Sequence, residues 1–374
     1  MKTIIKKLLM LQVVLILLVI ATACNRAGST TGAASPFSGE KIIVHGLKDQ
    51  DFEITQDDLR KLRAVTRHGE ATRTNGEKIS VDATGPLLDT FLHQYGKSQK
   101  DFNRIRFTAR DKYSIAVPHD ILENRQIILS YINDGKPLED DCQPVRIVIP
   151  GERSMYWVRE MIRMDFETGD GQKPVNKLVF LETAVGQLPQ EDYQYYDSTD
   201  KAVKTEDLIT RYADISDQAV TNVLMKAGDG LQKYETRANF LGSYLKITGK
   251  EAPKFIAPQL PEGMHIRDLL FIIYGQTAFF DYTEGIACLP KQTVEGKEGI
   301  ALSQIIKQTG MAGGNWYKFT GVDGGSVELE TDELGNGLIY QNTRGDLTFI
   351  SPGISGKSSL NNLLLIEVDL PNAS

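Results

Sequence analysis

The chain has 374 residues, which is enough for two ordinary domains or one large domain with insertions. Hydrophobic residues make up 41% of the sequence and charged residues 24%, so globular cores can form and wholesale disorder is excluded. A net charge of −7 argues against nucleic acid as a partner, and three cysteines are too few for a disulfide scaffold.

The first 23 residues have the pattern of an export signal. Lysines at positions 2, 6 and 7 precede an apolar run from Leu8 to Ile20, which is too short to cross a bilayer comfortably. Residues 24–40 are rich in Gly, Ser, Thr and Ala, as a flexible tether should be. We therefore expect a signal peptide at residues 1–23 and a tether at residues 24–40.

The segment Ala21-Thr-Ala-Cys24 resembles the lipobox of bacterial lipoproteins, in which the signal peptide is cut before the cysteine and the cysteine carries a lipid. The resemblance implies lipidation at Cys24. It also implies an extracytoplasmic protein that is anchored to a bacterial membrane through this lipid. The alternative is an ordinary signal peptide with an incidental cysteine.

Two stretches of the remaining sequence align with each other without a gap. Residues 85–96 and 299–310 each place apolar residues at helical spacing between two bounding glycines. Shortly after them, residues 107–117 and 319–329 each alternate apolar and polar residues around a turn that begins with aspartate. Each copy therefore predicts a helix followed by two strands.

A further landmark follows both stretches in the same order. Pro150-Gly151 and Pro352-Gly353 each precede an apolar segment. Matched landmarks in a constant order are hard to obtain by chance. We therefore predict two related domains at residues 41–172 and 176–374, the second with an insertion. Residues 205–270 repeat two of the signals more faintly, so a third, degenerate copy stays open.

The first copy contains motifs that point to a known family. Asp111-Lys-Tyr-Ser114 follows a predicted strand, and Gln143-Pro-Val-Arg-Ile-Val-Ile-Pro-Gly151 comes later in the chain. In their order these motifs resemble the oxidoreductase molybdopterin-binding domain of the sulfite oxidase superfamily. The resemblance covers nearly all of residues 41–172 and, more loosely, 280–374. It implies an α+β fold with two tandem sulfite-oxidase-like molybdopterin-binding domains, built of mixed sheets and short helices.

In that family a cysteine thiolate binds molybdenum, because a soft, deprotonated sulfur suits a metal that transfers oxygen and two electrons. Cys288, eleven residues before Gly299, is the candidate for this metal ligand and catalytic residue. The alternative is a buried structural cysteine. Lys318 is a candidate charge partner for molybdopterin in the second copy, and Asp323 is a further candidate cofactor-binding residue.

The first copy has no cysteine in the corresponding predicted loop, residues 65–73. Arg67 and His68 in this loop could hold an anion, because the pterin phosphate needs Arg, Lys, His or backbone N–H donors. The alternative is a solvated polar loop. The resemblance also assigns Arg146 and Asp111 to the cofactor site.

Three other residues are expected to be structural. Cys142 is expected to be a small, partly buried residue, and a disulfide between Cys142 and Cys288 stays open. Trp157 and Trp316 are expected to anchor the cores of the two domains.

The export signal bears on the cofactor. It carries Lys6-Lys7 and no paired arginine, so it resembles a signal of the general secretory route, whose cargo crosses the membrane unfolded. An unfolded chain cannot carry a cofactor that its fold holds. Molybdopterin-containing proteins that work outside the cytoplasm usually leave it folded, so the signal argues against a bound cofactor.

Three hypotheses follow. The first is an extracytoplasmic oxidoreductase with molybdopterin at Cys288. The second is a non-catalytic lipoprotein that keeps the fold without molybdenum and binds a small ligand or a partner in the envelope. The third is a solute-capturing lipoprotein unrelated to the superfamily. The sequence leaves enzymatic activity open.

Overall fold

The computed structural model describes residues 39–73, 76–169, 174–195, 198–352 and 359–369. The predicted signal peptide, Cys24 and almost all of the predicted tether lie outside the described residues. The elements below belong to one compact unit, Glu40–Ser374. Within the described part of the chain, no helix combines the length and the apolar character that a membrane span needs.

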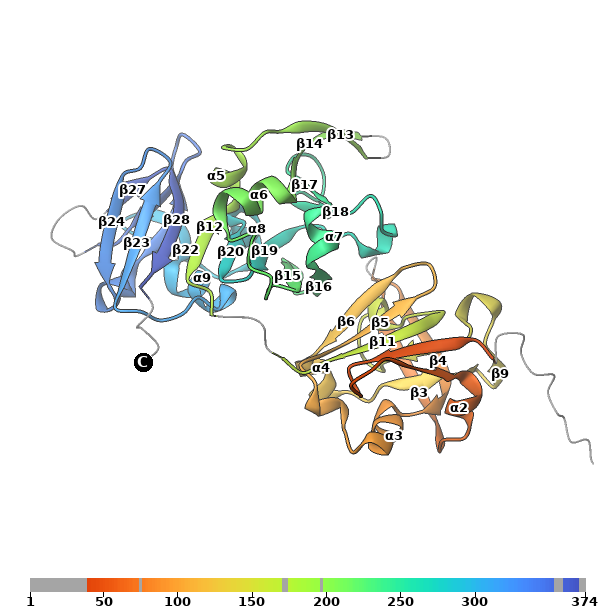
Figure 1. The fold of residues 1–374 in the computed structure, drawn as a ribbon. Helices are drawn as coiled ribbons and strands as arrows, with labels where there is room; N and C mark the ends of the chain where they lie inside the picture. The colour runs from red at the N-terminus through yellow and green to blue at the C-terminus, as the bar shows by residue number, and fades with distance from the viewer. Residues whose placement is uncertain (1–38, 74–75, 170–173, 196–197, 353–358, 370–374) are drawn as a thin grey trace, which may run out of the picture. The chain divides into compact units, whose positions relative to one another are not determined.

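The first segment, defined here as residues 41–167, is built on a five-stranded sheet in the order β2-β1-β11-β5-β6 (Figure 1). β1 is parallel to β11, and the other neighbours are antiparallel. A second sheet has the order β3-β4-β8-β9, and β7 pairs with β10. The elements are β1 (Lys41–His45), β2 (Phe52–Thr55), α2 (Gln56–Arg60), β3 (Ala64–Thr72), β4 (Lys78–Pro86), α3 (Leu88–Leu92), β5 (Arg104–Ala109), β6 (Ser114–Pro118), α4 (His119–Asn124), β7 (Ile128–Ser130), β8 (Ile132–Asn133), β9 (Lys136–Pro137), β10 (Arg146–Val148) and β11 (Met161–Glu167).

The second segment is defined as residues 177–274 and the third as residues 277–368. Together they form an eight-stranded sheet in the order β16-β15-β19-β20-β12-β28-β23-β24 (Figure 1). The second segment contains β12 (Lys177–Phe180), α5 (Leu181–Val185), β13 (Glu191–Tyr195), β14 (Ser198–Lys204), α6 (Thr205–Tyr212), β15 (Asn222–Ala227), β16 (Gln232–Thr236), α7 (Arg237–Leu241), β17 (Tyr244–Lys246), β18 (Lys254–Ile256) and β19 (Leu269–Tyr274).

The third segment completes this sheet and adds a five-stranded sheet in the order β21-β22-β25-β26-β27. Its elements are β20 (Thr277–Phe280), α8 (Tyr282–Cys288), β21 (Lys291–Val294), β22 (Lys297–Ala301), α9 (Leu302–Thr309), β23 (Trp316–Gly321), β24 (Ser326–Glu330), β25 (Leu338–Gln341), β26 (Leu347–Ile350), β27 (Ser359–Asn361) and β28 (Leu363–Val368).

The eight-stranded sheet carries a separate core on each face, because successive side chains of a strand point to opposite faces. Leu178 and Phe180 of β12 belong to one core with residues of the third segment. Val179, between them, belongs to the other core with residues of the second segment. The central pair β12 and β20 is parallel, and both strands are buried on both sides, as central strands require.

The same succession of elements occurs in all three segments. A strand and a short helix are followed by two antiparallel strands, a second helix, a β-hairpin, further short elements and finally a closing strand, and in the first segment β1 precedes this series. In each segment the closing strand lies beside the first strand of the hairpin, as β11-β5-β6, β19-β15-β16 and β28-β23-β24.

The three hairpins share their turn chemistry. In each turn an aspartate Oδ1 accepts the N–H of the residue two positions later, which is the typical role of aspartate in a turn. The N···O distances are 2.8 Å for Asp111 and Tyr113, 2.9 Å for Asp229 and Leu231, and 2.9 Å for Asp323 and Gly325.

The turn of each hairpin is also tied to the residue before the closing strand. The N–H of the residue before the aspartate donates to the carbonyl oxygen of a residue with positive φ. The pairs are Arg110 with Glu160 (3.1 Å, φ 45°), Gly228 with Asp268 (2.8 Å, φ 52°), and Val322 with Asn362 (3.0 Å, φ 50°).

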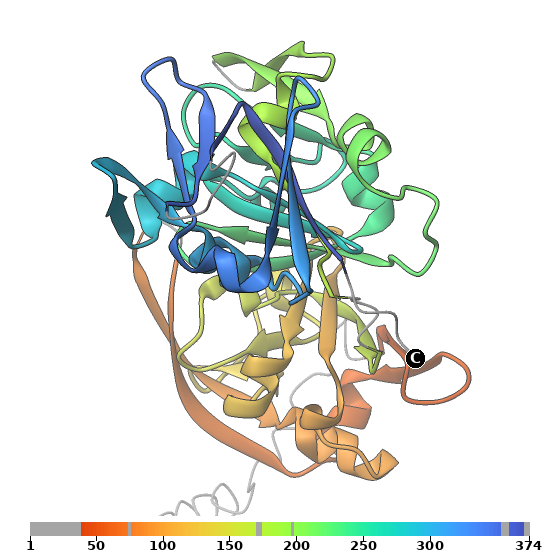
Figure 2. The same cartoon turned by 90° about the vertical axis from the view of Figure 1, so that its left-hand side faces the viewer.

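The structure confirms the predicted α+β class, with short helices and many strands. The helices expected within 85–96 and 299–310 are α3 and α9, and Gly310 ends α9 in the left-handed conformation. The expected loop 65–73 is instead β3, which pairs with β4 along nine residues and appears in Figure 2 as a long curved ribbon. Its polar residues form a strand because this pairing, not an apolar face, satisfies the backbone.

Candidate functional site

Arg146 is the central residue of the motif that suggested the family. It begins β10, opposite Ser130 of β7, and its guanidinium carbon lies 5.4 Å from the centre of the Trp157 ring. Nε is buried and has no hydrogen-bond partner among the described residues. Burial lowers the pKa of Arg146, because the charged form is poorly solvated there. Such a donor could bind an anion.

Trp157 is buried, as expected, and its indole N–H donates to the Ile149 carbonyl at 2.8 Å. Cys142 is also buried, with 4% of its surface exposed. Burial raises the pKa of its thiol, whereas the Arg146 guanidinium lowers it and the Asp141 carboxylate raises it. Burial thus disfavours the thiolate form of Cys142.

The other predicted residues of the first segment take structural or exposed positions. Asp111 forms the hairpin turn described above. It also lines a surface pocket together with Tyr113 and Arg159. Arg67 and His68 lie exposed on β3. Arg67 donates to the Thr66 carbonyl, and His68 Nδ1 lies 2.8 Å from Asp82 Oδ1, which raises the pKa of His68.

The third segment places its predicted residues on different elements. Lys318 lies on β23, 3.7 Å from the Glu328 carboxylate on β24, and Asp323 forms the turn between these strands. Cys288 is the last residue of α8 and is an exposed, free thiol. Its pKa is raised by partial burial of the sulfur and by Glu284, whereas the Lys226 ammonium group opposes this shift. Trp316, expected in the core, is 38% exposed on β23.

Among the described residues, no hydrogen bond or ion pair joins any two of the predicted site residues. Cys142 and Cys288 are both free thiols. No group of three or more His, Cys, Asp or Glu residues in the described part of the chain could hold a metal ion. The two described cysteines are thus lone thiols rather than members of a ligand cluster, and Arg146 fits an anion contact.

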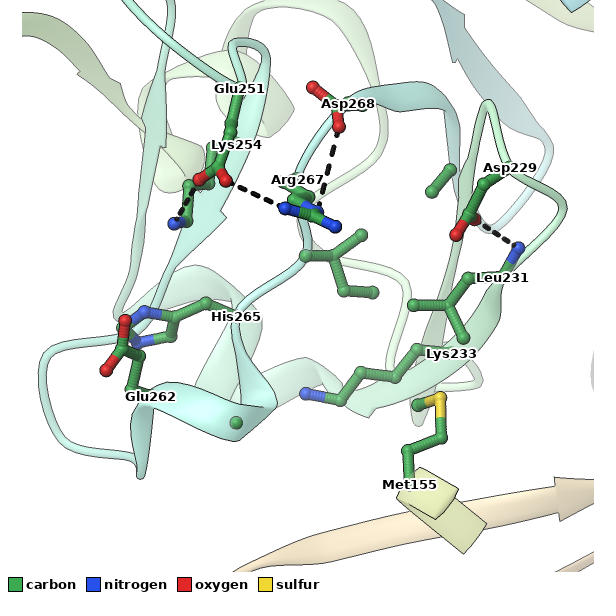
Figure 3. A pocket seen from close by; sticks show the side chains of 13 residues that line it. Met155, Asp229, Leu231, Lys233, Glu251, Lys254, Glu262, His265, Arg267 and Asp268 are labelled. Atoms are coloured by element: carbon green, nitrogen blue, oxygen red, sulfur yellow. Dashed lines mark hydrogen bonds and ion pairs between the residues drawn. The ribbon is translucent and has the colours of Figure 1, made fainter. Parts of the chain in front are cut away.

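The structure reveals a pocket that the sequence did not predict. It has a volume of about 450 Å³ and is formed almost entirely by residues 227–268 of the second segment (Figure 3). Lys233 on β16 projects into it, and Met155, Leu231 and Ile266 supply apolar surface. This size is typical of small-ligand sites.

The charged walls of this pocket form ion pairs. Glu251 accepts from Lys254 at 3.0 Å and from Arg267 at 2.9 Å, and Arg267 also lies 3.8 Å from Asp268 (Figure 3). The Arg153 guanidinium donates to Asp229 at 2.8 Å. The carboxylates of the walls are thus largely neutralised by neighbouring cations.

A fully buried ion pair lies at the base of the pocket. Lys233 is 1% exposed and Glu235 is 0% exposed, and Lys233 Nζ lies 3.0 Å from Glu235 Oε2. Burial lowers the pKa of Lys233, whereas Lys233 and the Asn239 amide keep the pKa of Glu235 low against its own burial. The Lys233–Glu235 pair therefore lies in a site that is poorly hydrated.

The sequence of the first segment matches a known protein family. Residues 38–174 match the family described as "Oxidoreductase molybdopterin binding domain". This match confirms the predicted resemblance for the first segment, and the second and third segments lie outside it.

Comparison with solved structures finds a similarity to the crystal structure of the sulfane dehydrogenase SoxCD from Paracoccus pantotrophus. The sequences are 11% identical, and the match covers 89% of this chain and 79% of that chain with a TM-score of 0.32. No curated protein matches the sequence.

Proposed function

We propose that this chain is a lipid-anchored, extracytoplasmic binding protein that keeps a molybdopterin-domain scaffold without a molybdenum–thiolate centre. It binds a small ligand or an envelope partner rather than catalysing oxygen transfer. The match of residues 38–174 to the molybdopterin-binding family supports the scaffold. The sequence pattern that ends in Cys24 supports the anchor.

The setting of the two described cysteines carries the proposal. A metal-binding cysteine must be deprotonated and reachable, so it normally lies near cations. Cys142 is buried near Asp141 and the Arg146 guanidinium, and Cys288 is exposed near Glu284 and the Lys226 ammonium group. Burial is the largest influence on both thiols and raises the pKa of each, and neither cysteine belongs to a cluster of metal-ligating side chains among the described residues.

The tandem organisation is part of the proposal. We infer that the three segments descend from one unit, since the order of elements, the aspartate turns and the turn-to-strand hydrogen bonds recur. This extends the two predicted domains to three copies. The second and third copies share one sheet instead of forming separate domains.

Elemental analysis of native protein extracted from its membrane tests the proposal. We expect no molybdenum in the native protein and no difference in Cys142→Ser and Cys288→Ser variants. Molybdenum at about one atom per chain, lost in either variant, would overturn it. Cys24→Ser should release the protein from the membrane fraction, and continued membrane association of this variant would contradict the lipid anchor.

A second candidate function is a molybdopterin-dependent oxidoreductase. The family match and the unpartnered Nε of Arg146 favour it, since a buried guanidinium could hold the phosphate of a pterin. The same measurement decides between the two functions. Recovery of a pterin with the metal from native protein, and its loss in Arg146→Leu but not in Arg159→Leu, would support the enzyme.

A further inference from the structure

The second segment differs from its two neighbours at two buried positions of the hairpin. The second and fourth residues of β6 are Ile115 and Val117, and those of β24 are Val327 and Leu329. All four are buried in apolar cores. The same positions of β16 hold Lys233 and Glu235.

The strand pairing shows that these positions correspond. Ile115 lies opposite Phe107, Lys233 opposite Met225, and Val327 opposite Phe319. The fourth residues lie opposite Ile105, Val223 and Tyr317 in the same order. The hairpin therefore accepts apolar residues at both positions, and the ion pair is not a requirement of the fold.

The presence of a buried ion pair is not explained by stability alone. Replacing such a pair with apolar residues of similar volume is often neutral or stabilising, because desolvation opposes the attraction of the charges. The apolar residues of the other two hairpins show that this alternative is available to the same backbone. Buried ions that stability does not require are characteristic of functional sites.

The ammonium group of Lys233 has capacity for one more acceptor. An ammonium has three hydrogens to donate. Lys233 donates one to the Met264 carbonyl and faces Glu235 with another. Besides these two oxygen atoms, the ammonium group lies 5.8 Å from the centre of the Phe255 ring, and no third oxygen acceptor contacts it among the residues that the structure describes. The side chain lines the pocket (Figure 3).

We infer that the pocket around Lys233 binds a small organic monocarboxylate, with the carboxylate on the ammonium group and the apolar chain against Leu231, Ile266 and Met155. This inference rests on the proposed binding function and gives its ligand class. The wall carboxylates are largely paired with cations, so the single ammonium group of Lys233 matches the one charge of a monocarboxylate better than the two charges of phosphate.

Calorimetric titration of the full chain with hexanoate, hexanamide and inorganic phosphate tests the inference. Hexanoate should bind at least about tenfold more tightly than hexanamide, because only the carboxylate makes a charge-assisted hydrogen bond. Phosphate should bind more weakly than hexanoate. No binding of hexanoate, equal binding of the amide, or tighter binding of phosphate would overturn the assignment.

The variant Lys233→Val/Glu235→Leu gives this hairpin the residues of β24 and leaves no unpaired buried charge. It should fold and should lose at least about tenfold in hexanoate affinity. Lys246→Met is the matched control, since Lys246 is buried in the same segment, pairs with Asp200 at 3.0 Å and does not line the pocket. Equal hexanoate binding by the double variant and the native protein would contradict the inference.

The two proposals fail separately. Molybdenum bound through a cysteine would overturn the proposed function whatever hexanoate does. If molybdenum is absent and hexanoate does not bind, only the carboxylate site is wrong.

Discussion

The hairpins of the second and third segments share a backbone and differ in their interior. Both have an aspartate turn, the same antiparallel pairing and a closing strand beside the first hairpin strand. β24 buries Val327 and Leu329, whereas β16 buries Lys233 and Glu235 beside a pocket of about 450 Å³. This difference indicates that strand pairing and turn hydrogen bonds hold the fold. Individual buried positions can therefore take a functional role.

The largest effect is expected when only one member of the buried Lys233–Glu235 pair is removed. Glu235→Leu leaves Lys233 buried without its carboxylate and should destabilise the protein by about 3–5 kcal/mol. Lys233→Val/Glu235→Leu removes both ions and should be neutral or stabilising by about 1–4 kcal/mol. Urea unfolding of the three proteins measures this. An equal loss in the single and double variants would show that the pair itself stabilises the fold.

The next-largest effect concerns the position three residues before the second helix of each segment. This position is glycine in the first and third segments. A Cβ on Gly85 would collide with the Leu129 carbonyl, and one on Gly299 with the Ile339 carbonyl. The second segment has Ala202, buried, at this position. Gly85→Ala and Gly299→Ala should each cost about 1–3 kcal/mol in thermal or urea unfolding.

Ala202→Gly is the control for these two variants. It relieves no collision and should cost about 0.5–1 kcal/mol through backbone entropy alone. A loss as large as that of Gly85→Ala would mean that steric fit does not distinguish the segments.

A smaller effect is expected to be common to all three hairpins. Replacing Asp111, Asp229 or Asp323 with alanine removes the hydrogen bond to the N–H two residues later. Each variant should lose about 0.5–1.5 kcal/mol in urea unfolding. The Asp229→Ala variant should lose the most, because Asp229 also accepts from Arg153. A variant without any loss would show that this turn forms without its aspartate.

The last prediction concerns acids at the ends of β12 and β20. Glu182 and Asp281 follow these parallel strands, and their carboxylates accept the Thr283 and Glu284 N–H groups at 2.7 and 2.8 Å. Burial raises the pKa of both, above ordinary values of 4.5 and 3.8, and Glu182 raises that of Asp281 further. Glu182 Oε2 has no hydrogen-bond partner among the described residues.

Because these pKa values are raised, the folded state keeps its protons at pH values at which the unfolded state has already released them. Stability should therefore fall as the pH rises from about 4 toward the folded-state pKa values. Glu182→Gln removes this loss, so its stability relative to the native protein should increase with pH in urea unfolding between pH 4 and pH 8. Asp58 is the contrast, because its pKa is lowered to about 2 by Lys61 and Thr55. A pH-independent difference between Glu182→Gln and the native protein would contradict the prediction.

Local patterns in the sequence predicted local structure well. The periodicity of residues 299–310 and the bounding glycine predicted α9, and Asp111 and Asp323 were placed in turns that the structure contains. The fold class and the family of the first segment follow from motifs of the same kind. Each depends on residues that are close in the chain.

The pocket could not be predicted in this way, although a signal existed. Aligning residues 231–235 with 113–117 and 325–329 would have shown charges at Lys233 and Glu235 where the other copies are apolar. The second copy was too different from the other two to align with them without the hydrogen bonds of its turn. Trp316 was expected in the core for its size, but β23 turns that side chain to the surface.

The sequence alone determined the α+β class, the helix and turn positions and the resemblance of the first segment, because these depend on short-range periodicity, turn residues and contiguous motifs. Only the tertiary structure decided that Cys142 is buried and that Cys288 is an exposed thiol. It also decided that Lys233 faces a pocket over a buried carboxylate. Burial and charge environment arise from residues that are distant in the chain, so no local pattern encodes them.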